Sequence, residues 1–383
     1  MDWSFLINGK DALCVTTDSR KVTPGCIFVA LKGEHFDGNA FVDQAREQGA
    51  SYVICGESAL TDLQDLARAW RRYLNLPILG ITGTNGKTTT KELCAAVLST
   101  KYNLYYTQGN LNNQLGVPLT LLSITRAHEM AIVEMGASHP GDIKELVEIA
   151  EPNFGLITNV GRAHLEGFGS FEGVQRTKAE LYDYLRAHGG FCFRNIDNPY
   201  LAQMAGDLKT VAYHTGTMPE GTHLVGGYNA ENVQAAICVG KYFGISEEQA
   251  LTAIRAYVPS NNRSQFMQTE RNTVVVDAYN ANPTSMQAAI NSFKGDCYIL
   301  GAMRELGEYS HLEHQNIVNM LLERKADKVL LVGEEYKSTT APYPIFDNVE
   351  ALCEHLQSEP LKGYHILLKG SRSNQLEKVI SLL

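Results

Sequence analysis

The sequence predicts an α/β protein built from three domains. The chain has 383 residues, enough for two or three domains of roughly 100–200 residues each. Two long stretches in which apolar strands alternate with amphipathic helices follow a smaller mixed stretch, a pattern typical of parallel sheets covered by helices. Pro77 and the segment 259–263 (Pro-Ser-Asn-Asn-Arg) separate these stretches. We therefore expect domains at residues 1–76, 77–258 and 259–383.

The composition excludes several classes of protein. With 33 Lys and Arg against 42 Asp and Glu, the net charge is −9, which disfavours a sequence-independent grip on nucleic acid but permits a local cationic pocket. No apolar run reaches the ~20 residues that span a bilayer, and the N-terminus lacks the pattern of a signal peptide. The eight cysteines form no CxxC pair, so we expect reduced core thiols in a cytoplasmic protein.

The first stretch, residues 1–76, predicts a small mixed α/β domain. Apolar segments at 26–31 and 51–55 favour short strands. A helix follows, because Leu63, Leu66, Ala67, Trp70 and Leu74 recur at helical spacing. Pro77 ends that helix and marks the domain edge.

The second and third stretches each predict a parallel sheet. In the second, apolar runs at 131–135 and 155–160 favour buried strands, and helical faces lie at 143–150 and across 231–257. In the third, strands are expected at 273–278, 296–301, 328–333 and 365–369, with helices near 284–293 and 312–324. This alternation indicates a Rossmann-like C-terminal domain behind a central parallel-sheet domain.

A Gly-rich turn at the start of the central domain predicts a phosphate loop. A short strand from Ile78 leads into Gly83-Thr-Asn-Gly-Lys-Thr88, and a helix follows. Glycines let backbone N–H groups converge on phosphate oxygens, Lys87 reaches the outer phosphates, and Thr88 can bind Mg²⁺. The alternative is an ordinary strand-to-helix turn. Ile81 stands where the strict pattern has glycine, which disfavours an ordinary P-loop kinase or GTPase.

Three residues further along are candidate metal ligands. Glu134 ends a predicted strand beside the phosphate loop, where a carboxylate can hold Mg²⁺. His164 follows the next strand and is either a metal ligand or a histidine satisfied by the protein. Lys178 is either a surface cation or, once carbamylated, an anionic ligand. The residues by themselves leave these alternatives open.

Together the motifs resemble the Mur ligases, the ATP-dependent amino-acid-adding enzymes of peptidoglycan precursor synthesis. The central-domain motifs are GTNGKTTT (83–90), EMGA (134–137), NVGRAHLEGFGS (159–170) and RTKAE (176–180). Further segments are similar to the branch that adds D-alanyl-D-alanine: TDSR (17–20), GCIFVALKGEHFDGNAFV (25–42), GNLNNQLGVPLTLL (109–122), DAYNANPTSM (277–286), LGAMRELGEYS (300–310) and LLKGSR (367–372). They cover nearly the whole chain in the expected order.

The resemblance implies a ligase that joins D-alanyl-D-alanine to UDP-N-acetylmuramoyl-tripeptide. ATP would convert the tripeptide's terminal carboxylate into an acyl phosphate, which the dipeptide amine then attacks. The implied partners are these small molecules, with no nucleic acid and no membrane insertion, and the implied state is a monomer. Neither the third residue of the peptide nor the oligomeric state can be derived from the motifs.

The resemblance also implies roles for individual residues. For ATP it implies a site formed by Gly83, Thr84, Asn85, Gly86, Lys87, Thr88, Thr89, Asn229, Asn232, Arg263, Asp277 and Asn280. For two Mg²⁺ ions it implies Thr88, Glu134, His164 and carbamylated Lys178 as ligands, with Lys87, Lys178, His164 and Arg263 as the catalytic set. For the other substrates it implies Thr17, Ser19, Arg20, Lys32 and Gly33 at the uridine-diphosphate site, Asn112, Asn113 and Gln114 in the cleft, and Lys369, Ser371 and Arg372 for carboxylates.

Two departures from the family pattern are visible. Tyr228 stands where the family usually has histidine, beside the adenine asparagines. Only about thirty residues separate Asn195 from Tyr228, where full-length relatives usually carry an additional strand-rich subdomain. We therefore expect a compact member of the family whose phosphate loop and metal ligands are intact.

Two alternative functions remain. One is a ligase of the same superfamily with another acceptor, such as a different Mur ligase or a folate polyglutamate ligase. The other is a nucleotide-binding module without ligase activity. The segments 279–283 and 369–372 argue against the first alternative, and the filled catalytic positions argue against the second.

Overall fold

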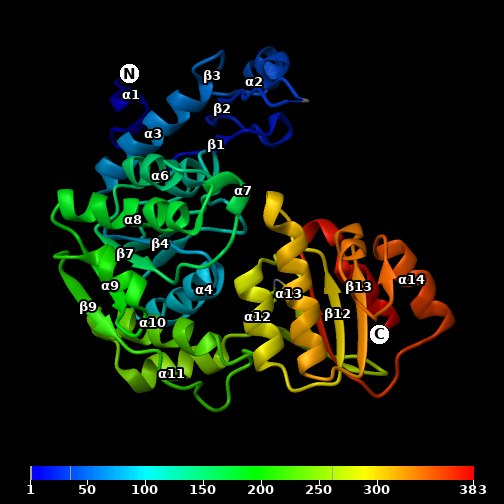
Figure 1. Ribbon diagram of the computed structural model, residues 1–383. Coiled ribbons are helices and arrows are strands. Elements are labelled where there is room, and N and C mark those ends of the chain that lie inside the picture. Colours follow the sequence, from blue (N-terminus) through cyan, green and yellow to red (C-terminus); the bar gives the residue numbers. More distant parts are fainter. Residues whose placement is uncertain (1, 35, 261) are drawn as a thin grey trace.

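The computed structural model describes residues 2–34, 36–260 and 262–383 and arranges them around three sheets (Figure 1). The sheets have the strand orders β1-β2-β3, β5-β6-β4-β7-β8-β9 and β10-β11-β15-β12-β13-β14. Each sheet uses its own stretch of the chain, and all strand pairs except β10–β11 are parallel. The predicted α/β class with parallel sheets is confirmed.

The first region contains a three-stranded sheet and short helices. Its elements are α1 (Ser4–Ile7), β1 (Val15–Thr16), η1 (Ser19–Lys21), β2 (Ile27–Val29), η2 (Gly38–Phe41), α2 (Val42–Glu47), β3 (Tyr52–Ile54) and α3 (Ala59–Leu74). Strands β2 and β3 and helix α3 lie where the pattern predicts them. Strand β1 was not predicted, because two residues are too short to show an alternation.

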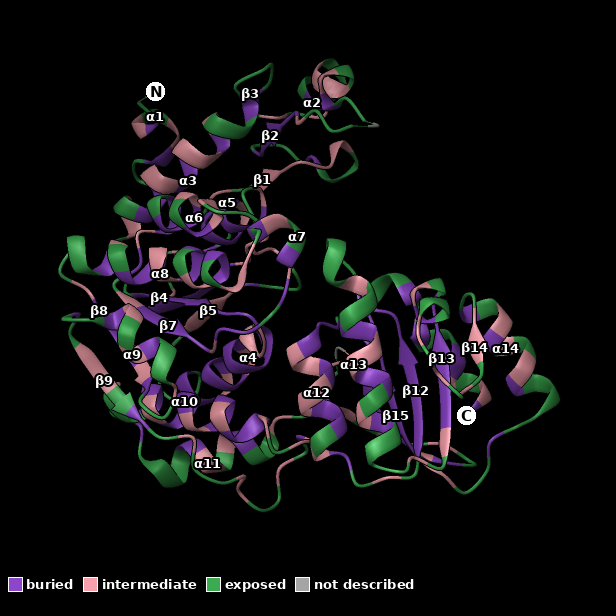
Figure 2. Ribbon diagram, in the orientation of Figure 1, coloured by how far each residue is buried: buried purple, intermediate pink, exposed green. Residues whose placement is uncertain are grey.

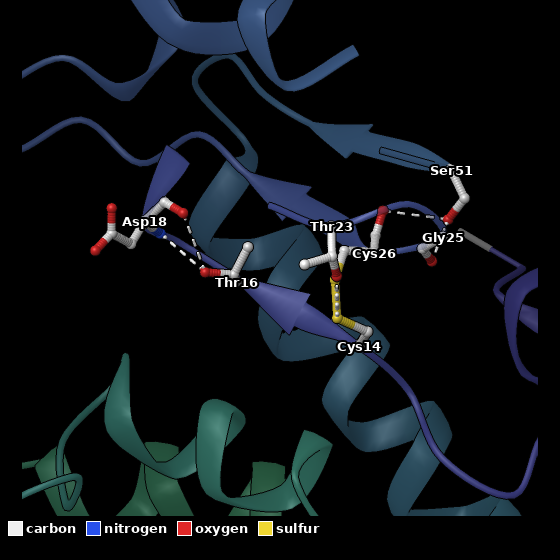
Figure 3. Close-up of a disulfide and its surroundings, with 7 residues drawn as sticks. All are labelled: Cys14, Thr16, Asp18, Thr23, Gly25, Cys26 and Ser51. Carbon is white, nitrogen blue, oxygen red and sulfur yellow. Dashed lines mark hydrogen bonds between the residues drawn. A yellow bond between two sulfur atoms is a disulfide. The ribbon is translucent and has the colours of Figure 1, made fainter. Parts of the chain in front are cut away.

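A disulfide in this region corrects one expectation from the sequence. Strand β1 pairs with β2 so that Val15 lies opposite Ile27, which brings the preceding residues Cys14 and Cys26 to a Cα separation of 4.6 Å. Figure 3 shows the two sulfur atoms bonded beside Thr23. The prediction of reduced thiols is therefore wrong for this pair, because the strand register that joins them is not visible in a spacing of twelve residues. Cys55, also expected in the core, is exposed.

The central region has a six-stranded parallel sheet. Its strands are β4 (Ile78–Thr82), β5 (Leu104–Tyr106), β6 (Met130–Glu134), β7 (Phe154–Ile157), β8 (Phe191–Asn195) and β9 (Thr210–Tyr213). Its helices are α4 (Lys87–Leu98), α5 (Gly116–Leu122), α6 (Asp142–Ala150), α7 (Leu165–Phe168), α8 (Phe171–Ala187), α9 (Pro199–Ala205), α10 (Asn229–Tyr242) and α11 (Glu247–Ala256). Strand β4 lies in the interior of this sheet, between β6 and β7.

Alternate residues of the central strands face two separate helix layers. Ile78 of β4 packs in one core cluster with α5, α6 and α8, whereas Leu79 and Ile81 pack in another with α4, α10 and α11. This explains why the strands read as uninterrupted apolar runs, since both faces of the sheet are covered. Figure 2 shows these strands buried between helices with exposed outer surfaces.

The C-terminal region repeats this layered plan. Its strands are β10 (Gln265–Gln268), β11 (Thr273–Asp277), β12 (Cys297–Gly301), β13 (Lys328–Val332), β14 (Ile345–Phe346) and β15 (His365–Lys369). Its helices are α12 (Pro283–Ser292), η3 (Gly307–Tyr309), α13 (Ser310–Glu323), η4 (Glu334–Ser338), α14 (Val349–Ser358), η5 (Arg372–Asn374) and η6 (Leu376–Leu382). Helices α12 and α13 pack on one face of the sheet, and α14 and η6 on the other.

The first and central regions share one continuous core. Residues of α3 and β2 belong to the same buried cluster as residues of α5, α6 and α8. Two buried side chains of α3 reinforce this junction: the Trp70 indole donates to Ile124 O at 2.9 Å, and Arg71 Nε donates to Ala150 O at 3.1 Å. The C-terminal clusters contain no buried core residue from the first region, among the residues that the structure describes.

In the described part of the chain, every helix is too short or too polar to cross a membrane.

Candidate active site

The predicted phosphate loop connects the interior strand β4 to helix α4. The loop residues after β4 are held by the loop that follows β7: Thr84 N donates to Asn159 O at 2.9 Å, and Asn85 N donates to Asn159 Oδ1 at 3.0 Å. The N-terminus of α4 begins at Lys87, so its free N–H groups face the same edge of the sheet. This edge, at the carboxyl end of an interior parallel strand, is where α/β proteins bind nucleotides.

Two glycines of the loop are required by the backbone. Gly83 and Gly86 have φ values of +140° and +78°, in the region that favours glycine. A Cβ on Gly83 would overlap the Thr158 side chain, and one on Gly86 would lie 2.5 Å from Asn232 Oδ1. Ile81, the departure from the strict motif, is buried within β4. The turn therefore starts two residues later than in the strict pattern.

The side chain of Lys87 binds the backbone of the phosphate loop. Its Nζ donates to Gly83 O at 2.8 Å and to Thr84 O at 3.0 Å. Burial, opposed by Glu134 and assisted by Arg263, lowers the pKa of Lys87 to about 8. The ammonium is thus poised to gain an anionic partner such as a phosphate.

Glu134 and Thr88 have the donor chemistry of a Mg²⁺ site. Glu134 Oε1 accepts from Thr88 Oγ1 at 3.2 Å and from Asn112 Nδ2 at 2.8 Å. Its other oxygen, Oε2, is buried with no hydrogen-bond partner among the described residues, and the nearest cation, Lys91 Nζ, is 3.9 Å away. A carboxylate oxygen without a hydrogen bond in a 1% exposed residue fits a cation ligand. Across residues 2–34, 36–260 and 262–383, no three His, Cys, Asp or Glu side chains cluster as a complete metal site, so phosphate and water oxygens would have to complete it.

His164 and Lys178 lie near Lys87 of the phosphate loop. His164 precedes α7 with φ +50°, and its Nδ1 is paired with Glu305. Burial lowers the pKa of His164; Glu305 opposes this shift, and the neighbouring cations Lys87 and Lys178 add to it. Lys178, on α8, is only 2% exposed, and its Nζ lies 5.5 Å from the centre of the Phe168 ring. It is therefore not a surface cation.

The electrostatic state of Lys178 is unusual for lysine. Burial lowers its pKa well below the ordinary value, and Lys87 lowers it further. Its ammonium has no hydrogen bond or ion pair within the described residues. A neutral amine is the form favoured in this environment.

The asparagines predicted to hold adenine lie at the start of α10, against the phosphate-loop helix. Asn232 Oδ1 accepts from Thr90 Oγ1 at 3.0 Å, and Asn232 Nδ2 donates to Asn229 Oδ1 at 2.9 Å. Tyr228 is not free to stack as a loose ring, because its hydroxyl is hydrogen-bonded to Ser264 Oγ at 2.6 Å. The tyrosine instead ties the start of α10 to the C-terminal region.

The C-terminal region brings a second group of predicted residues to the loop. The Arg263 guanidinium lies 3.7 Å from the centre of the Tyr279 ring, which holds it by a cation–π contact. Asp277 Oδ1 accepts from Ser264 N at 3.3 Å, and Asn85 Nδ2 contacts Asn282 Oδ1 at 3.4 Å. The central and C-terminal regions thus meet directly at the phosphate loop.

One cavity of about 1020 Å³ joins most of these groups. Predicted nucleotide, metal and cleft residues line it: Thr84, Asn85, Gly86, Lys87, Thr88, Thr89, Asn112, Asn113, Gln114, Glu134, His164, Asn229, Asn232, Arg263, Asp277, Asn280 and Lys369. Gly83 and Lys178 are not among its lining residues, although Gly83 directly precedes the lining residue Thr84. A cavity of this size accommodates a nucleotide together with a second ligand.

Other predicted residues lie apart from the cavity. Thr17, Ser19 and Arg20 follow β1, and Lys32 and Gly33 follow β2, so the parallel pairing places the two segments at one edge of the first sheet. Ser371 is buried, and Arg372 lies 5.7 Å from the Tyr279 ring. None of these seven residues lines the cavity in the described structure.

Two residues of the site lie inside the family motifs, although the sequence predicts no role for either. Glu305 pairs with His164, and Tyr279 carries Arg263. Their motifs, LGAMRELGEYS and DAYNANPTSM, were the available signal. The specific contacts depend on how the C-terminal region docks, which no local pattern describes.

The fold and site define a nucleotide-binding enzyme of the phosphate-loop class, with a second α/β region that closes over the loop. Family models agree along the chain: "Mur ligase family, catalytic domain" matches residues 13–96, "Mur ligase middle domain" matches 81–221, and "Mur ligase, glutamate ligase domain" matches 262–372. The chain belongs to the Mur ligase family of ATP-dependent ligases.

Similar proteins indicate to which branch of the Mur ligase family the chain is related. UDP-N-acetylmuramoyl-tripeptide–D-alanyl-D-alanine ligase of Bacillus subtilis (strain 168) is 33% identical over 96% of this chain and 92% of the relative. The Escherichia coli (strain K12) protein of the same name is 32% identical over 96% and 93%. The crystal structure of the MurF ligase from Thermotoga maritima in complex with ADP has a TM-score of 0.86 at 27% identity, over 97% of each chain. A MurF structure from Acinetobacter baumannii has a TM-score of 0.83 at 28% identity, over 96% of this chain and 92% of that one.

The length comparison supports a compact member. The Bacillus subtilis alignment spans 423 positions, 40 more than the 383 residues of this chain, so the relative has at least that many additional residues. In this chain, residues 199–213 form only α9 and the edge strand β9. That the missing residues belong between Asn195 and Tyr228 stays a prediction.

Proposed function

We propose that this protein uses ATP to join D-alanyl-D-alanine to UDP-N-acetylmuramoyl-tripeptide, forming an amide bond in peptidoglycan precursor synthesis. The relatives named for this reaction support the proposal, because they match 96% of the chain at 32–33% identity. The observation that carries it is the single cavity in which the phosphate loop, Glu134 and His164 meet Arg263 and Asp277.

The chemistry requires activation of a carboxylate. The γ-phosphoryl group of ATP transfers to the tripeptide carboxylate, and the resulting acyl phosphate has phosphate as its leaving group. The dipeptide amine attacks the acyl carbon, the tetrahedral intermediate collapses, and phosphate departs with a proton released from nitrogen. Lys87 and Arg263 would stabilise charge on the transferring oxygens. Enclosure by the C-terminal region would exclude water from the acyl phosphate.

Mg²⁺ is the proposed cofactor, as two ions. Thr88 and Glu134 would hold the first, and His164 with carbamylated Lys178 would hold the second. When bound, the ions would neutralise phosphate charge and orient the substrate carboxylate. The buried Glu134 Oε2, which has no hydrogen-bond partner among the described residues, is the observation that favours this assignment.

Carbamylation of Lys178 is consistent with its environment. Carbamate formation joins the nitrogen of a neutral amine to the carbon of CO₂ and releases one proton. Burial disfavours the ammonium form of Lys178 and so favours the reactive amine. The product carries a negative charge, which would replace the repulsion from Lys87 with an attraction.

We further propose that the chain acts as a monomer in the cytoplasm. ATP and uridine-diphosphate-linked substrates are cytoplasmic compounds.

A phosphate-release assay tests the proposal. With ATP, Mg²⁺ and the nucleotide-linked tripeptide, we expect release that depends on D-alanyl-D-alanine and not on glutamate. Release that depends on glutamate would favour a ligase with another acceptor. ATP binding without acceptor-dependent release would favour a nucleotide-binding module.

A further inference from the structure

Glu305 contacts the candidate metal ligand His164 from a different part of the fold. His164 precedes α7 in the central region, whereas Glu305 lies between β12 and η3 in the C-terminal region. A carboxylate oxygen of Glu305, Oε2, is paired with His164 Nδ1. Both residues have positive φ values, +50° and +61°, although neither is glycine. Such conformations persist where surrounding contacts hold them, and they concentrate at functional sites.

Further contacts hold the two segments together. Glu166 N approaches Glu305 O at 3.4 Å, and Arg162 N donates to Thr284 Oγ1 at 2.9 Å. Arg162 also forms an ion pair of 3.1 Å with Glu313, whose side chain is only 1% exposed. Figure 1 shows α7 facing the C-terminal region. The His164–Glu305 pair is therefore part of a docked interface and not an isolated surface contact.

The pairing leaves one ring nitrogen of His164 available. A histidine that donates from Nδ1 to a carboxylate presents an unprotonated Nε2, and carboxylates commonly orient metal-binding histidines in this way. Both residues line the cavity beside the phosphate loop. The same contact restricts rotation of the ring, since the Glu305 carboxylate lies against Nδ1.

We propose that Glu305 is a positioning residue that orients His164 for the divalent cation, and that the cation site is complete only when the C-terminal region is docked. This rests on the proposed function, which makes His164 a metal ligand. The new element of the proposal is that His164 is oriented by the C-terminal region, which also carries Arg263 and Asp277 toward the nucleotide. Cation binding and docking would therefore favour one another.

The test uses the whole protein with Mn²⁺ and ADP as probes. Electron spin-echo spectroscopy of bound Mn²⁺ detects a coordinated histidine nitrogen, and a titration gives the Mn²⁺ dissociation constant. The variants are Glu305→Ala, Glu305→Gln, His164→Ala as a reference for signal loss, and Glu308→Ala as a matched control. Glu308 is an exposed acid in the same segment with no contact to His164. Melting temperatures confirm that each variant is folded.

We expect the histidine-nitrogen signal in the wild type and its loss in His164→Ala. Glu305→Ala should weaken the signal and raise the Mn²⁺ dissociation constant about tenfold. Glu305→Gln should lose less, because its amide oxygen still accepts from Nδ1, and Glu308→Ala should match the wild type.

Two results would overturn the proposal, and they are distinguishable. A wild-type nitrogen signal that stays unchanged in Glu305→Ala, with an unchanged dissociation constant, would reject the role of Glu305 while leaving the ligase function intact. A wild type without any histidine-nitrogen signal would reject His164 as a ligand, and with it both the proposed metal site and the role of Glu305.

Discussion

Lys369 Nζ lies 2.6 Å from Asp277 Oδ2, across neighbouring positions of the parallel strands β15 and β11. The same ammonium donates to Asn280 O at 3.2 Å. Lys369 is 1% exposed, so its ammonium is directed at the segment that contains Asp277 and Asn280, and not at solvent. The sequence had suggested a contact with a substrate carboxylate. The structure favours an indirect role, in which Lys369 holds the proposed nucleotide contacts in place.

Lys369→Met should therefore reduce stability. Removing one partner leaves the Asp277 carboxylate, 16% exposed, without its cation, and we expect a loss of roughly 2–4 kcal/mol in the free energy of unfolding. Urea denaturation measures this loss. The double variant Lys369→Met with Asp277→Asn should recover part of it, because no unpaired charge remains. Equal stability of the single variant and the wild type would show that the pair contributes nothing.

Lys87→Ala should abolish turnover without unfolding the protein. Lys87 Nζ is hydrogen-bonded to the carbonyl oxygens of Gly83 and Thr84, within the loop that is expected to hold the phosphates. We expect phosphate release to fall by at least about 100-fold, by analogy with the loss of other transition-state donors. Lys10→Ala, at an exposed lysine of the first region, is the matched control. Full activity in Lys87→Ala would remove the phosphate loop from the mechanism.

Nucleotide binding should depend on pH through Lys87. Its pKa of about 8 in the free protein means that the ammonium is present below pH 8 and lost above it. Phosphate oxygens bind the ammonium and raise its pKa, so ADP should bind with proton uptake near pH 8. The affinity should fall about tenfold between pH 7 and 9. Calorimetry in buffers with different ionisation enthalpies measures the uptake, which should disappear in Lys87→Met. A pH-independent affinity would contradict the lowered pKa.

Activity should depend on CO₂ through Lys178. The buried amine is expected to bind CO₂, so CO₂-free buffer should reduce phosphate release and added bicarbonate should restore it. Carbon-13 NMR with labelled bicarbonate should show one carbamate resonance in the wild type and none in Lys178→Met. Lys144→Met, at an exposed lysine paired with Glu148, should keep the resonance. A resonance retained in Lys178→Met would place the carbamate elsewhere.

Local patterns predicted much of the fold. Helix α3 follows the 3.6-residue spacing of Leu63, Leu66 and Trp70, and β15 begins and ends at the predicted residues. Strands β6 and β7 were expected within one to three residues of their observed bounds. These elements are encoded by apolar periodicity and by short breaks, which a single sequence displays directly.

The candidate site was predictable only in part. Glu134 could be placed because a strand end and the phosphate loop share one edge of a parallel sheet. The Cys14–Cys26 pair depends on the register of β1 against β2, and the Glu305 and Tyr279 contacts depend on docking of the C-terminal region. The family resemblance implies a ligand role for Lys369, whereas its pairing with Asp277, 92 residues away, could not be derived from motif spacing. Periodicity and motif spacing do not predict contacts between residues that are far apart in the sequence.

The core that α3 shares with α5, α6 and α8 has a thermodynamic consequence. A chain with three sheets would, at first sight, melt in three steps. Because residues on both sides of Pro77 lose their apolar contacts together, the first two sheets should melt as one cooperative unit, and only the third can melt by itself. Differential scanning calorimetry should then resolve two endotherms, and ADP should shift both, since its proposed contacts lie on each side of the remaining boundary.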